Sequence, residues 1–283
     1  MDEKNWLLAA GMEIVLLMLA VSLLLNRPYP GVSGSDSIEG LRLIYKTIDS
    51  PEDIFPLHGP TVLPIAYTSV VSFANLDVKE KKRKFFDLML PTVLISKHKL
   101  AILRERIQNY LDKESRSEGE QDWLEKQLLL FDADNYRQLL QKTEDHPVSI
   151  VLAQAALESG WGESRFFREA NNVFGVWSFN PEEPRVDAGV RRLGREIFMK
   201  KYNSLIESVD DYFLTIARGP YRSFRRERQR HDDPFLLINH LTRYSVQGNR
   251  YVRRLRWVIE RNDLQRYDSF YLDPRFLVDK LEG

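Results

Sequence analysis

Apolar residues recur at helical spacing through most of the chain, and this periodicity limits it to a mainly helical fold. Because side chains three and four residues apart share one face, each such stripe predicts an amphipathic helix. Pro91 predicts a break in the first stripe. Val186 to Tyr202 alternates weakly around Gly194, which predicts a β-hairpin. The stripes cover residues 78–90, 93–111, 123–130, 136–140, 148–158, 208–217, 234–241 and 251–261.

The N-terminal segment Trp6 to Leu25 is mostly apolar. At 1.5 Å per residue it spans roughly 30 Å, which is the hydrocarbon thickness of a bilayer. A cleaved signal peptide has a shorter apolar core and a cleavage site of small residues, and residues 22–26 offer no such site. We therefore predict an uncleaved, single-pass anchor in the inner (cytoplasmic) membrane, with the rest of the chain in the periplasm.

Changes in composition divide the chain into four predicted regions. Residues 1–26 form the transmembrane signal anchor. Residues 27–60 begin with a Pro-, Gly- and Ser-rich stretch and form a tether or linker. Residues 61–145 form a helical extension that begins with an extended segment over Thr61 to Phe73, and residues 146–283 form the main domain.

Composition excludes several kinds of chemistry. The chain has 283 residues and no cysteine, so disulfides, thiol nucleophiles and zinc–thiolate sites are ruled out. The five histidines have no metal-ligand spacing, and we expect no metal and no cofactor. The net charge is zero, yet residues 185–283 contain 21 Lys and Arg against 14 Asp and Glu. This basic region predicts an anionic partner.

The helix predicted over Val148 to Glu158 carries the strongest candidate for chemistry. Its apolar residues share one face, and Glu158 lies at the edge of that face, just before Gly160 and Gly162 end the helix. Partial burial and the negative helix end both raise a carboxyl pKa. A carboxyl group that stays protonated near neutral pH can donate a proton to a leaving glycosidic oxygen.

At these residues the chain resembles the glucosaminidase family, family 73 of the glycoside hydrolases, and within it the Bax-type proteins. The resemblance covers roughly residues 60–265. The most specific block is residues 154–162, Gln-Ala-Ala-Leu-Glu-Ser-Gly-Trp-Gly. Further matching blocks are residues 85–91, 164–166, 171–175, 219–225 and 244–248, together with Tyr251.

The resemblance implies a lysozyme-like helical fold and hydrolysis of the β-1,4 bond after N-acetylglucosamine in peptidoglycan strands, an endo-β-N-acetylglucosaminidase activity. Glu158 matches the general acid. Many members carry a second acidic residue on the hairpin, in a Thr-Glu-Tyr-like stretch that this chain lacks. Asp187 and Glu196 are the acidic residues there, and we favour Asp187. Three mechanisms then remain open: an inverting mechanism with a distant base, one assisted by the substrate's acetamido group, and one that depends on a single acid.

Five residues are candidates for contacting the sugars: Trp161, Asn172, Phe174, Tyr221 and Tyr244. Aromatic residues in helical domains are more often core, and Asn172 equally fits a role in holding its loop. The arginine-rich run 222–230 fits an anionic wall polymer as well as nucleic acid, and we expect no nucleic acid. Two alternatives remain: a catalytically silent peptidoglycan-binding module, and a cell-wall amidase.

Overall fold

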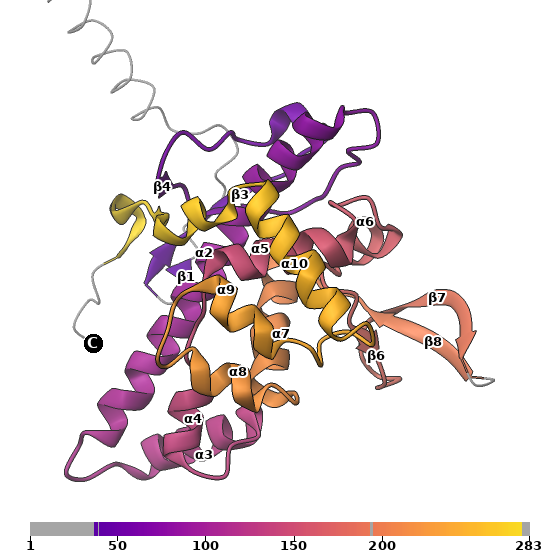
Figure 1. The fold of residues 1–283 in the computed structure, drawn as a ribbon. Helices are drawn as coiled ribbons and strands as arrows, with labels where there is room; N and C mark the ends of the chain where they lie inside the picture. Colours follow the sequence, from indigo (N-terminus) through magenta and orange to yellow (C-terminus); the bar gives the residue numbers. More distant parts are fainter. Residues whose placement is uncertain (1–36, 39, 193–194, 279–283) are drawn as a thin grey trace, which may run out of the picture. The chain divides into compact units, whose positions relative to one another are not determined.

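A computed structural model describes residues 37–38, 40–192 and 195–278. Its helices confirm the predicted mainly helical fold (Figure 1). The α-helices are α2 (Val78–Leu111), α3 (Glu118–Phe131), α4 (Tyr136–Lys142), α5 (Val148–Ser159), α6 (Arg165–Ala170), α7 (Leu205–Arg218), α8 (Arg222–Glu227), α9 (Pro234–Leu237) and α10 (Asn249–Arg261). The 3₁₀ helices are η1 (Pro51–Asp53), η2 (Ile238–His240), η3 (Leu264–Ser269) and η4 (Pro274–Phe276).

The predicted break at Pro91 is wrong, because α2 runs unbroken through it. Asp77 caps the N-terminus of α2 by accepting from the amides of Lys79 and Glu80. Proline removes only one backbone donor, and every residue from 84 to 96 is buried. Packing on all sides therefore keeps this helix continuous.

The strands form small separate sheets. β7 (Arg185–Arg192) and β8 (Arg195–Lys200) pair antiparallel, which confirms the predicted hairpin, and β6 (Trp177–Ser178) pairs on the other side of β8. The register of β7 shifts between Asp187 and Arg191, as in a β-bulge. Bulges bend a strand and increase its twist.

The other strands join distant parts of the sequence. β1 (Ser37–Ile38) pairs antiparallel with β2 (Leu41–Arg42). β3 (Ile44–Lys46) pairs parallel with β5 (Ile65–Tyr67), and β4 (Thr61–Val62) pairs parallel with β9 (Tyr271–Leu272). The β4–β9 pair therefore joins the N-terminal part of the described chain to its C-terminal part.

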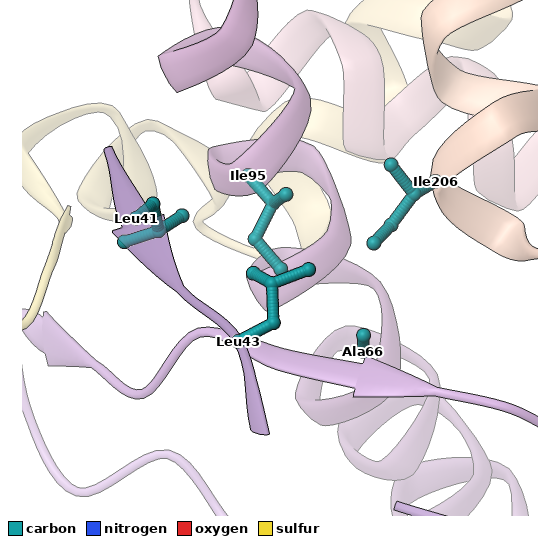
Figure 2. Packing of buried hydrophobic residues seen from close by; sticks show 5 residues of the cluster. All are labelled: Leu41, Leu43, Ala66, Ile95 and Ile206. Carbon is teal, nitrogen blue, oxygen red and sulfur yellow. The ribbon is translucent and has the colours of Figure 1, made fainter. Parts of the chain in front are cut away.

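The described part of the predicted linker is packed against the domain. Leu41, Leu43 and Ala66 form one buried cluster with Ile95 of α2 and Ile206 of α7 (Figure 2). The side chains of Leu41 and Ile95 are fully buried. Residues 41–67 therefore contribute to the same core as the helices.

Helix α5 has the central position for the site. It packs against α2, α10 and η3, and its residues 148–156 are buried. The predicted anchor Trp6 to Leu25 lies outside the described residues. In the part of the chain that the structure describes, no helix is both long enough and apolar enough to cross a membrane.

Candidate active site

Glu158 lies in the last turn of α5, where the chain leaves the core. Gly160 ends the helix in the left-handed region at φ 60°, and its amide binds the carbonyl of Ala156. Trp161 and Gly162 follow with φ of 62° and 81°. Ser159 fixes this turn, since its hydroxyl oxygen accepts from the Gly162 amide at 3.0 Å and donates to the Ala155 carbonyl at 2.6 Å. The Glu158 side chain is half-buried at the edge of α5.

Burial raises the pKa of the Glu158 carboxyl group above its ordinary value. A hydrogen bond from the Tyr251 hydroxyl and the positive charge of Arg254 both act in the opposite direction. The balance is a raised pKa, as the sequence predicts for this position. Glu158 therefore holds its proton to a higher pH than a solvated glutamate does, which suits a general acid.

Three tyrosines surround this carboxyl group. The rings of Tyr221 and Tyr244 lie 6.0 Å apart, and those of Tyr244 and Tyr251 stack at 5.4 Å. Burial raises the pKa of each of the three phenols, and the charge of Glu158 raises it further. All three therefore stay neutral and can donate hydrogen bonds.

Tyr221 is held in place by the glycine two residues before it. A Cβ atom on Gly219 would come within 2.5 Å of the Tyr221 ring and 2.8 Å of the Thr215 carbonyl. Arg225 supports the same turn by donating to the carbonyls of Ile216 and Gly219 at 2.8 and 2.9 Å. Only glycine at position 219 allows the ring this close to the end of α7.

A chain of buried hydrogen bonds continues behind Glu158. Gln154 Nε2 donates to the Tyr251 hydroxyl at 3.1 Å, and the Tyr212 hydroxyl donates to Gln154 Oε1 at 2.7 Å. The Tyr212 oxygen lies 2.8 Å from His146 Nε2. Since Tyr212 already donates to Gln154, it accepts from His146, which therefore carries its proton on Nε2.

Burial keeps His146 neutral, because it lowers the pKa of the imidazole well below the usual value. The chain therefore points in one direction, from His146 through Tyr212, Gln154 and Tyr251 to the carboxylate of Glu158. In the sequence, Gln154 and Tyr251 appear only as positions that match the glucosaminidase family, with no role assigned to either. Their contact depends on the packing of α5 against α10, which spacing along the chain does not reveal.

The two predicted hairpin carboxylates are both exposed. Asp187 Oδ1 accepts from the Gly189 amide at 2.8 Å. Glu196 forms an ion pair with Arg191 at 3.1 Å. Of the two, only Asp187 has no recorded cationic partner among the residues that the structure describes, and this leaves its carboxylate freer to act.

Three of the predicted sugar-contacting residues are engaged elsewhere. The half-buried Trp161 ring packs edge-on against Phe85 and Phe86 of α2, with centroids 5.9 and 5.6 Å away. Phe174 is 5% exposed and stacks on Tyr212 at 4.3 Å.

The third of these residues, Asn172, is almost fully buried. Its amide nitrogen donates to the carbonyls of Val176 and Lys200, both at 2.9 Å, and its oxygen accepts from the Val176 amide. This arrangement favours the loop-holding role over the substrate role. Within the described ranges, no group of three or more His, Asp or Glu side chains could hold a metal ion.

A carboxyl group with a raised pKa at a helix end, ringed by tyrosines, is the kind of site that an acid-catalysed hydrolase uses. Residues 133–264 match the family model for Glucosaminidase, described as mannosyl-glycoprotein endo-beta-N-acetylglucosaminidase. Over residues 133–264, just under half of its length, the chain is similar to this glucosaminidase family.

Two curated relatives agree with this assignment. The exo-glucosaminidase LytG of Bacillus subtilis is 29% identical over 159 residues, which are 51% of this chain and 54% of LytG. Protein bax of Escherichia coli is 31% identical over 120 residues, which are 40% of this chain and 42% of that protein. The chain thus spans about half the length of these relatives.

Among solved structures, the catalytic domain of the autolysin Auto from Listeria monocytogenes is 23% identical. The match covers 59% of this chain and 97% of that domain, with a TM-score of 0.37. At this TM-score the likeness carries no weight beyond the family match.

Proposed function

We propose that this chain is a peptidoglycan hydrolase that cleaves the β-1,4 bond after N-acetylglucosamine. The observation that carries the proposal is Glu158, a carboxyl group with a pKa raised by burial, inside the region that matches the glucosaminidase model. The relatives LytG and FlgJ, named as an exo-glucosaminidase and a peptidoglycan hydrolase, support this substrate. A lysozyme-like arrangement of the helices and hairpin around the glycan belongs to the same proposal.

In this mechanism Glu158 donates its proton to the glycosidic oxygen as the bond to the anomeric carbon breaks. The Tyr251 hydroxyl orients the carboxyl group and stabilises the carboxylate left after transfer. Asp187 is the preferred second carboxylate, activating water on the opposite side of the sugar. If Asp187 has no role, the substrate's acetamido group supplies that assistance.

The direct test is digestion of purified sacculi by the purified full-length chain, followed by chemical identification of the new ends. Reducing-end N-acetylglucosamine is the expected product. Glu158→Gln preserves size and hydrogen bonding but has no proton to donate, so the rate should fall by about 10²- to 10⁴-fold. Binding of glycan without any new ends indicates the silent binding module, and release of free peptides indicates the amidase.

The matched pair Asp187→Asn and Glu196→Gln identifies the second carboxylate. Both side chains are exposed on the same hairpin, so both variants should fold. A large loss of rate in Asp187→Asn alone supports the assignment. A loss in Glu196→Gln alone transfers the role to Glu196, and no loss in either favours the acetamido group.

We further propose that Trp6 to Leu25 anchors the protein in the inner membrane, with the hydrolase in the periplasm. The support is the length and apolar character of that segment. N-terminal sequencing of the membrane-bound protein provides the test. A mature protein that starts after Leu25 contradicts the anchor.

A further inference from the structure

A cavity of about 630 Å³ lies between α4 and the turn that joins α7 to α8. Five of its lining residues are cationic and two are carboxylates. We call this cavity the basic pocket. Its cations are Lys142, Arg218, Arg222, Arg225 and Arg243, and its carboxylates are Asp132 and Asp134.

The two buried cations of the basic pocket are fixed by backbone carbonyls. Lys142 is 6% exposed and donates to the carbonyls of Phe131 and Asp132. Arg225 is 7% exposed and donates to two carbonyls at the end of α7. The carboxylate nearest to Lys142, that of Asp132, is 3.9 Å away and largely exposed. These hydrogen bonds hold the two charges in place.

The cations also repel one another. Burial lowers the pKa of Lys142, and the charge of Arg225 lowers it further. The charges of Asp132 and Asp134 act in the opposite direction, and that of Arg218 lowers the pKa again. Burial and the charge of Arg222 lower the pKa of Arg225, and the charge of Asp132 partly offsets this. Within the described residues, no hydrogen bond or ion pair is recorded for the side chains of Arg218, Arg222 and Arg243. A bound anion would relieve this repulsion.

The basic pocket adjoins the candidate active site through shared segments of chain. Gly219, Pro220 and Arg222 line the pocket, while Tyr221, between them, lies within electrostatic reach of Glu158. In the same way Arg243 lines the pocket and the next residue, Tyr244, belongs to the tyrosine group around Glu158. A branched substrate could therefore occupy both.

We propose that the basic pocket binds the carboxylates of the stem peptide that branches from the glycan strand. This inference rests on the proposed function and names a second feature of the substrate. Neutral sugars give no reason for clustered cations, whereas arginine pairs well with carboxylates. The two aspartates suit an amino group on the same peptide. A linear polyanion such as nucleic acid fits less well, because it favours an extended basic track without acidic groups.

The test compares glycan strands with and without stem peptides. One ligand is glycan strands released by an endopeptidase, which keep their stem peptides. The other is the same strands after an amidase has removed the peptides, which leaves one lactyl carboxylate on each N-acetylmuramic acid. Affinity is measured with full-length Glu158→Gln protein, which should bind without cutting. We expect about tenfold tighter binding of the peptide-bearing strands.

The exposed arginines allow a matched comparison in the same background. Arg222→Gln with Arg243→Gln should reduce the preference to less than twofold. The control pair Arg226→Gln with Arg230→Gln removes two exposed charges outside the pocket, both of which pair with Glu227. This pair of substitutions should retain the preference. Circular dichroism of all variants verifies the fold.

Equal affinity for both ligands overturns the proposal that the basic pocket binds stem-peptide carboxylates. An equal loss of preference in the control pair also overturns it. Displacement of the strands by a single-stranded oligonucleotide of matched charge also overturns it in favour of a general polyanion surface. Failure of the proposed function is a separate result, seen when the wild-type chain produces no reducing ends from sacculi. The binding comparison stands in either case.

Discussion

The most informative residue is Glu158, whose chemistry depends on what touches it. The helix end and the partial burial follow from residues near it in the sequence. The hydrogen bond from Tyr251 comes from α10, more than 90 positions away. Opposing effects on one carboxyl group make its pKa adjustable by substitution.

Tyr251→Phe should shift the pH dependence of the reaction. The Tyr251 hydroxyl lowers the pKa of Glu158 by stabilising the carboxylate, so its removal raises that pKa. A general acid is active while protonated, and the alkaline limb of kcat/KM should therefore move to higher pH. The rate itself should also fall, because Gln154 loses its partner and the carboxyl group its orientation.

Tyr267→Phe is the control for that profile. Tyr267 is also buried, but its hydroxyl accepts a hydrogen bond from Arg266. The alkaline limb of kcat/KM for Tyr267→Phe should coincide with that of the wild type. A Tyr251→Phe limb that is unmoved, or moved to lower pH, contradicts the assigned hydrogen bond.

Glu158→Gln should raise stability at neutral pH. The pKa of Glu158 in the folded state lies above its unfolded value near 4.5, so ionisation favours unfolding. The stability of the wild type then declines as pH rises from about 4.5 through the folded pKa, and glutamine removes this decline. Melting temperatures from pH 3 to pH 8 should agree at the acid end and diverge above it, with the variant higher. A constant offset at every pH would mean that ionisation is not the cause.

At the scale of an element, the conformation of the turn after α5 depends on Gly160 and Gly162. Both lie in the left-handed region, so glycine avoids a penalty of about 1–2 kcal/mol there. They differ in their surroundings. A Cβ on Gly162 would lie 3.0 Å from Phe73 and 3.3 Å from Phe167, whereas a Cβ on Gly160 would meet nothing within 4 Å.

Gly160→Ala should therefore lower the free energy of unfolding by about 1–2 kcal/mol, the backbone penalty alone. Gly162→Ala adds crowding of buried rings, typically about 1–3 kcal/mol more. Urea unfolding followed by tryptophan fluorescence measures both. If the two variants lose equal stability, the contact with Phe73 and Phe167 does not constrain the turn.

At the scale of the whole molecule, residues 41–67 complete the core of the domain. Two polar side chains of α2 also hold this segment, since Lys84 donates to the Ile54 carbonyl and Asp87 accepts from the Leu57 amide. Its buried side chains are Leu41, Leu43, Ile44, Ile48, Ile54, Val62, Ile65, Ala66 and Tyr67. The predicted boundaries at residues 60 and 145 stay predictions, but the packing crosses both.

Removal of residues 1–72 should therefore prevent stable folding. Each large apolar side chain contributes about 1.5–3 kcal/mol when buried, against a typical total stability of about 5–15 kcal/mol. Removal of residues 1–35 alone keeps all of these side chains and is the control. Thermal melting followed by circular dichroism should show a cooperative transition for the control only. A cooperative transition at the same temperature in both would mean that the segment is dispensable.

The sequence by itself determined the longer helices, the hairpin and the position of Glu158, because these depend on spacing within one segment. The short helices α6 and α8 were not among its predictions. It placed the break at Pro91 wrongly, since the burial that keeps α2 continuous comes from distant segments. The tertiary structure alone decided which polar groups meet: Tyr251 with Glu158, and the cations of α4 and α8 around one cavity. Such contacts join residues far apart in the chain, and only the packing of one helix on another brings them within reach.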